Sequence, residues 1–241
     1  MAVRTLSKGY EARKLILAET KRSETSIEVW TLDMDSYDSI REFCERAASL
    51  ERIDGVLANA GVMTSHFSLS EGLEKQLNVN VVSTFLLYAL LLPKMRLSAR
   101  ETGNTCHFTI PNSALHYMAT TSEIKPGEKG LLTRMSNPDT AIMANNMRYN
   151  VSKLLIIFGV RAFATKATKM PNGSLDVIIN TPNPSFCKSD LSAEMKGNAG
   201  YATFERVMAR STEEGSRALV HGLLADGKSN GQYLNDCKVQ T

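Results

Sequence analysis

The sequence predicts a doubly wound α/β fold, in which a parallel sheet is covered by helices on both faces. Two observations indicate it. Segments with strand-like and helix-like patterns alternate along the chain, and the connections between them are short. The 241 residues, 43% of them apolar, suffice for one large domain or two small ones, and no composition shift marks a boundary. We therefore expect a single domain over residues 1–241.

Strands are expected where short apolar or alternating runs are bounded by turn residues. The N-terminal residues Met1–Arg4 have the pattern of a strand's end. Five further runs follow: Ser26–Leu32, Ile53–Leu57, Thr105–Ile110, Leu175–Asn180 and Gln232–Leu234. Because open parallel sheets bind ligands beyond the carboxyl ends of their strands, the residues that follow these runs are candidate site residues.

Helices are expected where apolar residues recur at a spacing of three to four. Five segments have this pattern: Ser7–Lys21 (with Ser7 as N-cap), Ser36–Leu50, Ser70–Arg96, Ala141–Lys166 and Ser211–Ala225. One long irregular stretch, Tyr117–Asn146, predicts a functional or mobile loop. The most apolar run, Val79–Pro93, contains polar residues and is too short to cross a bilayer, so we expect it inside a buried helix.

Composition narrows the function. The net charge of +3 is too small to indicate a nucleic-acid surface. The N-terminus has no long apolar core, which excludes a signal peptide and favours a cytoplasmic protein. The four cysteines show no Cys-x-x-Cys spacing, as expected for free thiols in a reducing compartment. The four histidines show no ligand spacing, so no metal site is expected.

Tyr149 and Lys153 form the most informative pair in the chain. Residues four apart lie one above the other on a helix face. An ammonium beside a phenol favours the phenolate, so we expect the pKa of Tyr149 to fall from about 10 toward neutrality. A tyrosine tuned in this way can exchange a proton with a substrate oxygen. The alternative is a surface lysine beside a half-buried tyrosine.

Three further segments follow expected strands and would reach the ligand edge of the sheet. They are Ala58–Gly61, Pro111–Ser113 and Asn180–Ser189. Small residues at a strand end let the backbone approach a ligand closely. Each segment alone is also typical of an ordinary turn.

Together these residues resemble the short-chain dehydrogenase/reductase family over nearly the whole chain. The matching residues, in chain order, are Asn59, Ala60 and Gly61 of its Asn-Ala-Gly motif, its active-site asparagine Asn80, its serine Ser113, its pair Tyr149 and Lys153, and a loop from Pro184 through Cys187 to Ser189 near the nicotinamide. The sequences of Arg148–Leu154 and Ser211–Arg217 are similar to those of a fungal subgroup akin to retinol dehydrogenases. That subgroup often works in specialised-metabolite pathways.

The resemblance implies hydride transfer between a nicotinamide and a small-molecule ketone or alcohol. Tyr149 would supply the proton, and Ser113 would hydrogen-bond the same substrate oxygen. Lys153 would hold the phenolate and the cofactor ribose, and Asn80 would hold a water that connects Lys153 to solvent. The family commonly forms dimers or tetramers through its long helices, here Ser70–Arg96 and Ala141–Lys166.

The choice of cofactor depends on residues at two strand ends. Arg4, with Lys8 nearby, stands where NADP-binding relatives carry a cation, so we expect NADP rather than NAD. Asp33 matches the family residue that contacts the adenine. An ordinary flanking charge at Arg4 is the alternative interpretation.

The chain also departs from the family. No Gly-x-x-x-Gly-x-Gly turn occurs, and the first residues already match the second family strand, so we expect a Rossmann-like three-layer α/β/α fold that lacks the first strand. Ser185 replaces a glycine, Cys187 a valine and Asn112 a serine. Two hypotheses remain: an NADP(H)-dependent ketone reductase or alcohol dehydrogenase, or a truncated, inactive protein without competent cofactor binding. An epimerase or dehydratase is a third, for whose substrate domain the chain is short.

Overall fold

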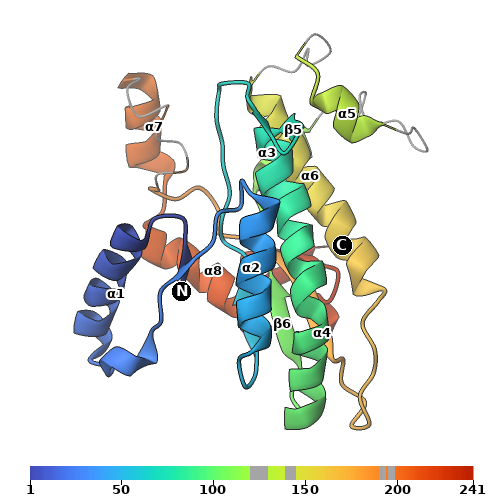
Figure 1. The fold of residues 1–241 in the computed structure, drawn as a ribbon. Helices are drawn as coiled ribbons and strands as arrows, with labels where there is room; N and C mark the ends of the chain where they lie inside the picture. Colours follow the sequence, from blue (N-terminus) through green and yellow to red (C-terminus); the bar gives the residue numbers. More distant parts are fainter. Residues whose placement is uncertain (120–129, 139–144, 190, 192–193, 195–198, 241) are drawn as a thin grey trace.

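We describe a computed structural model of the protein, covering residues 1–119, 130–138, 145–189, 191, 194 and 199–240 (Figure 1). Most of the helices run roughly parallel to one another around the central sheet. Part of the irregular stretch predicted between residues 117 and 146 lies outside the described residues.

The main sheet has five strands. Their order is β3 (Gly55–Leu57), β6 (Cys106–Thr109), β7 (Val177–Asn183), β8 (Tyr233–Asn235) and β9 (Lys238–Gln240). The first four are parallel, which confirms the predicted sheet, and β9 returns antiparallel to β8. The turn between these last two strands has positive φ angles at Asp236 and Cys237.

A second, two-stranded sheet lies apart from the first. It pairs β1 (Ala2–Val3) with β2 (Trp30–Thr31) in parallel, at the register Ala2 to Trp30. Within the described ranges, no strand pairs with the second edge of β1 or with the outer edge of β3. The division confirms the expectation of a doubly wound sheet that lacks a strand between these two edges.

The pleat of β6 shows why helices cover both faces of the sheet. Successive strand side chains point to opposite faces. On one face Phe108 packs edge-on against Tyr88 of α4 (Thr84–Thr102), with ring centroids 4.9 Å apart. On the other face Thr109 lies against Gly222 of α8 (Thr212–Leu224), where an added Cβ would come 2.8 Å from the threonine methyl.

The remaining helices complete these layers. Helices α2 (Tyr37–Ala48) and α6 (Asn145–Ala164) lie on the same side as α4, and α1 (Leu6–Thr20) lies beside β1 (Figure 1). Two predicted starts are confirmed. Ser36 caps α2 by accepting from the Ser39 amide, and Ser211 forms a capping box with Glu214. For α1 the N-cap is Thr5, so the predicted cap Ser7 is wrong and lies inside the helix.

The predicted helix Ser70–Arg96 is wrong in its first part. A hairpin, β4 (Leu69–Ser70) and β5 (Leu73–Glu74), precedes it, because Glu71 and Gly72 adopt positive φ angles that a helix does not allow. The helical region then begins with α3 (Lys75–Leu77), continues as a π-helical turn (Asn78–Ser83) and ends as α4.

Two helices were missed by sequence analysis, α5 (Leu131–Met135) and α7 (Ala199–Met208). Short 3₁₀ turns occur at Glu24–Ser26, Ala114–Met118 and Gly227–Ser229. Of the described segments, one, Lys75–Thr102, is long and apolar enough to cross a membrane, but 61% of its apolar window is buried, as expected of a core helix.

Candidate active site

Tyr149 and Lys153 lie one turn apart on α6, with their side chains together. The ammonium nitrogen is 5.6 Å from the centroid of the phenol ring. Both residues are buried, with exposed fractions of 4% for Tyr149 and 7% for Lys153. The alternative of a surface lysine beside a half-buried tyrosine is therefore wrong.

Ser113 joins this pair from the end of β6. It is the N-cap of the 3₁₀ turn Ala114–Met118, and its hydroxyl accepts from the Leu115 amide at 3.2 Å. The same hydroxyl forms a hydrogen bond with the Tyr149 phenol. The ring of His116 holds the turn through its Nδ1, 2.7 Å from the Ser113 carbonyl. Residues far apart in sequence thus meet at the carboxyl edge of the sheet.

Burial controls the charges of the pair. It raises the pKa of Tyr149 to about 12, although the hydrogen bond with Ser113 acts in the opposite direction. Burial also lowers the pKa of Lys153 to about 8. The predicted fall in the tyrosine pKa is therefore wrong in direction, because removal from water disfavours the phenolate and the ammonium alike. Tyr149 is a neutral phenol at pH 7, the form that can donate a proton.

Lys153 still has hydrogen-bonding capacity at this position. Its nitrogen donates to the carbonyl oxygen of Pro111 at 2.8 Å. An ammonium has three donors. The neighbouring Asn112 side chain is buried, and its Nδ2 has no hydrogen-bond partner among the described residues. These donors suit the hydroxyl groups of a bound sugar.

Asn80 lies in the π-helical turn and fastens the chain after β3. Its side chain accepts from the Val62 amide at 2.8 Å and donates to the Val62 carbonyl at 2.9 Å. It also donates to the Ser152 hydroxyl at 3.1 Å, which in turn donates to the Tyr149 carbonyl. Asn80 therefore links the strand end to α6, and its role in holding a water for Lys153 stays a prediction.

The Asn59-Ala60-Gly61 motif lies where the sequence predicted, directly after β3, and all three residues are exposed. An added Cβ at Gly61 would come 3.3 Å from Oδ1 of Asn80. A larger side chain here would press on the asparagine. The backbone at this strand end can thus approach a ligand closely.

The two predicted adenosine-side residues follow the small sheet. Arg4 is exposed just beyond β1, and Asp33 follows β2, where its Oδ1 accepts from the Asp35 amide at 3.0 Å. Burial acts to raise the pKa of Asp35, but hydrogen bonds and the charges of Lys75 and Arg4 lower it on balance. Arg4 and Lys75 therefore both act on this carboxylate, and Lys75 pairs with it at 2.6 Å.

The predicted nicotinamide loop follows β7. The Cys187 thiol donates to the Pro184 carbonyl at 3.2 Å, and burial raises its pKa. Ser189 accepts from the Leu191 amide at 3.4 Å. Ser185, where the family prefers glycine, has a φ of +67°. The backbone has thus kept the left-handed conformation that favours glycine.

We expect Ser185→Gly to stabilise the protein by about 0.5 kcal/mol, because relief of left-handed strain exceeds the added flexibility of the unfolded chain. Chemical denaturation measures the change. Ser189→Gly is the matched control, since Ser189 is not among the residues with positive φ, and it should destabilise. Equal loss of stability in both variants would contradict the expectation.

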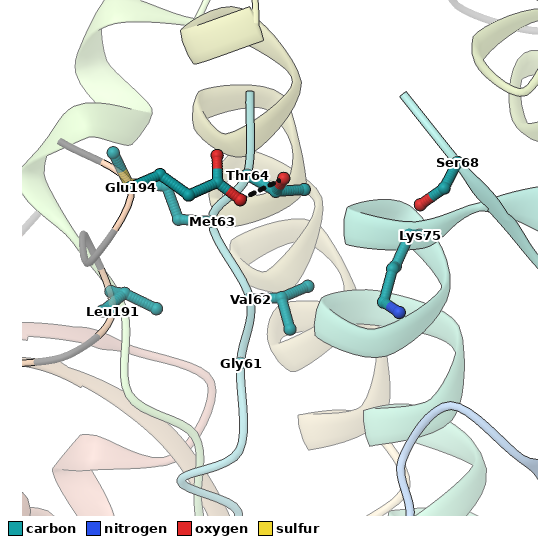
Figure 2. Close-up of a pocket in the computed structure, with 8 residues that line it drawn as sticks. All are labelled: Gly61, Val62, Met63, Thr64, Ser68, Lys75, Leu191 and Glu194. Carbon is teal, nitrogen blue, oxygen red and sulfur yellow. Dashed lines mark hydrogen bonds between the residues drawn. The ribbon is translucent and has the colours of Figure 1, made fainter. Parts of the chain in front are cut away.

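A cavity of about 370 Å³ is lined by Gly61 and the residues that follow it (Figure 2). Residues 61–64 run through it, with Ser68 and Lys75 on one side and Leu191 and Glu194 on the other. The Glu194 carboxylate accepts from the hydroxyl of Thr64 and from the amide and hydroxyl of Ser65 at 2.7–2.8 Å. These bonds lower the pKa of Glu194 to about 2.

The structure also reveals residues that sequence analysis did not single out. Glu74, Gln76, Arg148 and Ser152 are all buried around this cavity and Tyr149. One of these residues could have been noticed in the sequence, because Arg148 is a charged residue directly before Tyr149. The sequence alone does not identify its partner. Within the described ranges, no three His, Cys, Asp or Glu residues lie close enough to hold a metal ion.

Comparison with known protein sequences identifies the family. Residues 1–109 match the short chain dehydrogenase family model. The chain is 38% identical to short chain dehydrogenase/reductase dmxR8 of Cryptosporiopsis sp., covering all of this chain and 74% of the relative. It is 35% identical to short chain dehydrogenase atnD of Emericella nidulans, covering 98% of this chain and 74% of the relative.

Solved structures agree on the fold. An NADPH-bound carbonyl reductase from chicken fatty liver aligns with a TM-score of 0.65 at 15% identity, over 100% of this chain and 86% of that one. The oxidoreductase yciK from E. coli aligns with a TM-score of 0.64 at 18% identity, over 97% and 82%.

The relatives and the site agree that this chain is an oxidoreductase. It belongs to the short-chain dehydrogenase/reductase family, and it spans about three quarters of the length of the two fungal relatives compared above.

Proposed function

We propose that the protein is an NADP(H)-dependent oxidoreductase that reduces a ketone or oxidises a secondary alcohol. The observation that carries this proposal is the meeting of Ser113, Tyr149 and Lys153 in a buried site at the carboxyl edge of the sheet. We further propose a cytoplasmic location and a role in fungal specialised-metabolite biosynthesis, which the fungal relatives support.

The chemistry of the proposal follows from the charges at the site. A nicotinamide, when bound, supplies or accepts the hydride. As negative charge develops on a carbonyl oxygen, the neutral phenol of Tyr149 donates its proton to that oxygen. Ser113 donates a hydrogen bond to the same oxygen and orients it. Lys153 is mostly protonated at pH 7, given a pKa of about 8, and holds positive charge beneath the phenol.

The residues present fit one half of the cofactor. Lys153 and Asn112 offer donors to the nicotinamide ribose, and Arg4 with Lys75 offers cations at the adenosine side, which favours NADP over NAD. Asp33, the Asn59–Gly61 backbone and the loop from Pro184 through Cys187 to Ser189 would complete the contacts. The pyrophosphate half has no counterpart in this sequence, which contains no Gly-x-x-x-Gly-x-Gly turn.

A second candidate function follows from that mismatch. Among the described residues no strand pairs with the free edges of β1 and β3, and the sequence has no phosphate turn, which together favour a catalytically inactive relative without competent cofactor binding. Calorimetric titration with NADPH and NADH, beside turnover with a panel of ketones, separates the two. Micromolar NADPH binding with ketone reduction supports the enzyme. Absence of binding by the folded protein supports the inactive relative.

We also propose a homodimer or homotetramer that uses the outer faces of α4 and α6. Leu90 and Leu97 on α4, and Phe158 on α6, are large apolar side chains with exposed fractions of 40–47%. Sedimentation would show the assembly, and charged substitutions at Leu97 and Phe158 would dissociate it.

A further inference from the structure

A buried ion pair lies beside the proposed active site and has no place in the proton transfer. Glu74, at the end of β5, is fully buried, and Arg148, the residue before Tyr149, has an exposed fraction of 4%. The Nε of Arg148 lies 3.4 Å from Oε1 of Glu74. Buried charges are costly unless they are paired and hydrogen-bonded, so a pair at this position calls for a physical explanation.

Each partner of the pair is held by a different part of the chain. Glu74 accepts from the Leu77 amide at 2.9 Å and from Gln76 at 3.4 Å, which fixes it to the start of α3. Arg148 donates to the Ser65 carbonyl at 3.4 Å, and its guanidinium lies 5.5 Å from the ring centroid of Phe67. The pair therefore ties α3, α6 and residues 65–67 together.

Gly61–Thr64 and Ser68 line the cavity, and Val62 is linked to Tyr149 through Asn80 and Ser152. Thr64 and Ser68 line the cavity, and Ser65 and Phe67, the two residues that contact Arg148, lie between them. Asn80 holds the same segment at Val62, and Gln76 holds it at Thr64, with Nε2 donating to the carbonyl at 3.2 Å. On its other side the segment binds the Glu194 carboxylate through Thr64 and Ser65. The position of residues 64 and 65 therefore determines where Glu194 lies in the cavity.

We propose that Glu74 and Arg148 are positioning residues, which hold residues 64–67 against α6 so that the cavity wall stays in register with Tyr149. The substrate part of this proposal rests on the proposed function. The pair acts through the segment and touches no reacting atom. Its loss should loosen the wall and weaken substrate binding, while the proton donor on α6 stays in place.

The test uses Glu74→Gln and the double variant Glu74→Gln with Arg148→Met. The single variant removes the Glu74 carboxylate from beside a buried cation and should destabilise the whole protein. The double variant removes both charges and should recover most of that stability, but not the anchor at Ser65. Hydrogen exchange at the amides of residues 64–67 should be roughly tenfold faster in both variants.

The control is a second ion pair, Arg96 with Asp176, at the opposite end of the sheet, in which the carboxylate is buried and the arginine is partly exposed. Asp176 is fully buried, and the Nε of Arg96 lies 3.2 Å from its Oδ2. Asp176→Asn, alone and with Arg96→Met, should destabilise to a similar degree without changing exchange at residues 64–67. The KM for the ketone should rise roughly tenfold in the Glu74 variants, with kcat within about threefold, and should not change in the controls.

A double variant with wild-type stability, wild-type exchange at residues 64–67 and wild-type KM would overturn the proposal. The exchange measurement needs no activity. A wild-type protein without turnover would therefore refute the proposed function alone, and exchange would still decide the role of the pair.

Discussion

Tyr149→Phe should lower kcat for ketone reduction by about 10³-fold, the usual contribution of a positioned proton donor. Phenylalanine fills the same volume and lacks only the hydroxyl that meets Ser113. The fold should persist, since Tyr149 loses one hydrogen bond in a site with an exposed fraction of 4%. Steady-state kinetics with NADPH, at saturating ketone, measures the change.

Tyr88→Phe is the matched control for this substitution. Tyr88 is as buried as Tyr149, and burial also raises its pKa to about 12, but it packs against Phe108 and Phe163 in the core. Its loss of a hydroxyl should leave kcat within about twofold of wild type. Equal activity of wild type and Tyr149→Phe would remove Tyr149 from the mechanism.

Lys153→Met should stabilise the protein by about 2 kcal/mol at pH 7 and abolish its activity. Burial lowers the pKa of Lys153 from 10.5 to about 8, which corresponds to a free-energy cost of about 3 kcal/mol. The variant also loses the hydrogen bond from Lys153 to the Pro111 carbonyl, which reduces the expected stabilisation by about 1 kcal/mol. The net difference, about 2 kcal/mol, is the free energy of unfolding that the wild type loses by burying an amine in the site.

The sign of the pH dependence tests this explanation. Below pH 8 the lysine is charged in both the folded and the unfolded state, so the full cost of burial is present. Between pH 8 and 10.5 the folded protein binds fewer protons than the unfolded chain, and wild-type stability rises with pH. Urea denaturation at pH 7 and 9.5 should therefore show the advantage of Lys153→Met shrinking as pH rises.

Lys75→Met is the contrasting control, because Lys75 pairs with Asp35 at 2.6 Å. Its removal leaves the carboxylate without that partner and should destabilise rather than stabilise. A Lys153→Met protein less stable than wild type at pH 7 would show that the buried amine has a stabilising partner and would contradict the expectation.

The sequence predicted the architecture well where local chemistry agrees with burial. Alternating strand and helix patterns located α2, α8 and the parallel strands. The absence of a phosphate turn predicted the divided sheet. The hairpin before α3 escaped detection because the apolar periodicity continues across Gly72, and β9 escaped because its turn uses Asp236 and Cys237 rather than glycine.

The sequence predicted that Ser113, Tyr149 and Lys153 come together, but it did not predict the pKa values of the group. Order along the chain placed Ser113, Tyr149 and Lys153 together, since strand ends and helix faces follow from spacing. The pKa of Tyr149 is raised rather than lowered, because burial depends on all the residues that pack around a group and cannot be read from local sequence. The Glu74–Arg148 pair could not be predicted for the same reason, because 73 residues lie between its members and no local pattern joins them.

The π-helical turn at Asn78–Ser83 has a consequence for how this chain tolerates insertions and deletions. A π turn contains one residue more than an α turn, so the faces before and after it are offset by about 100°. Gln76 and Asn80 thereby face the 61–68 segment, while Tyr88 further along packs against Phe108 of the sheet. Deleting a single residue there would rotate one set away from its partners, so the length of this turn is constrained in addition to the identity of Asn80.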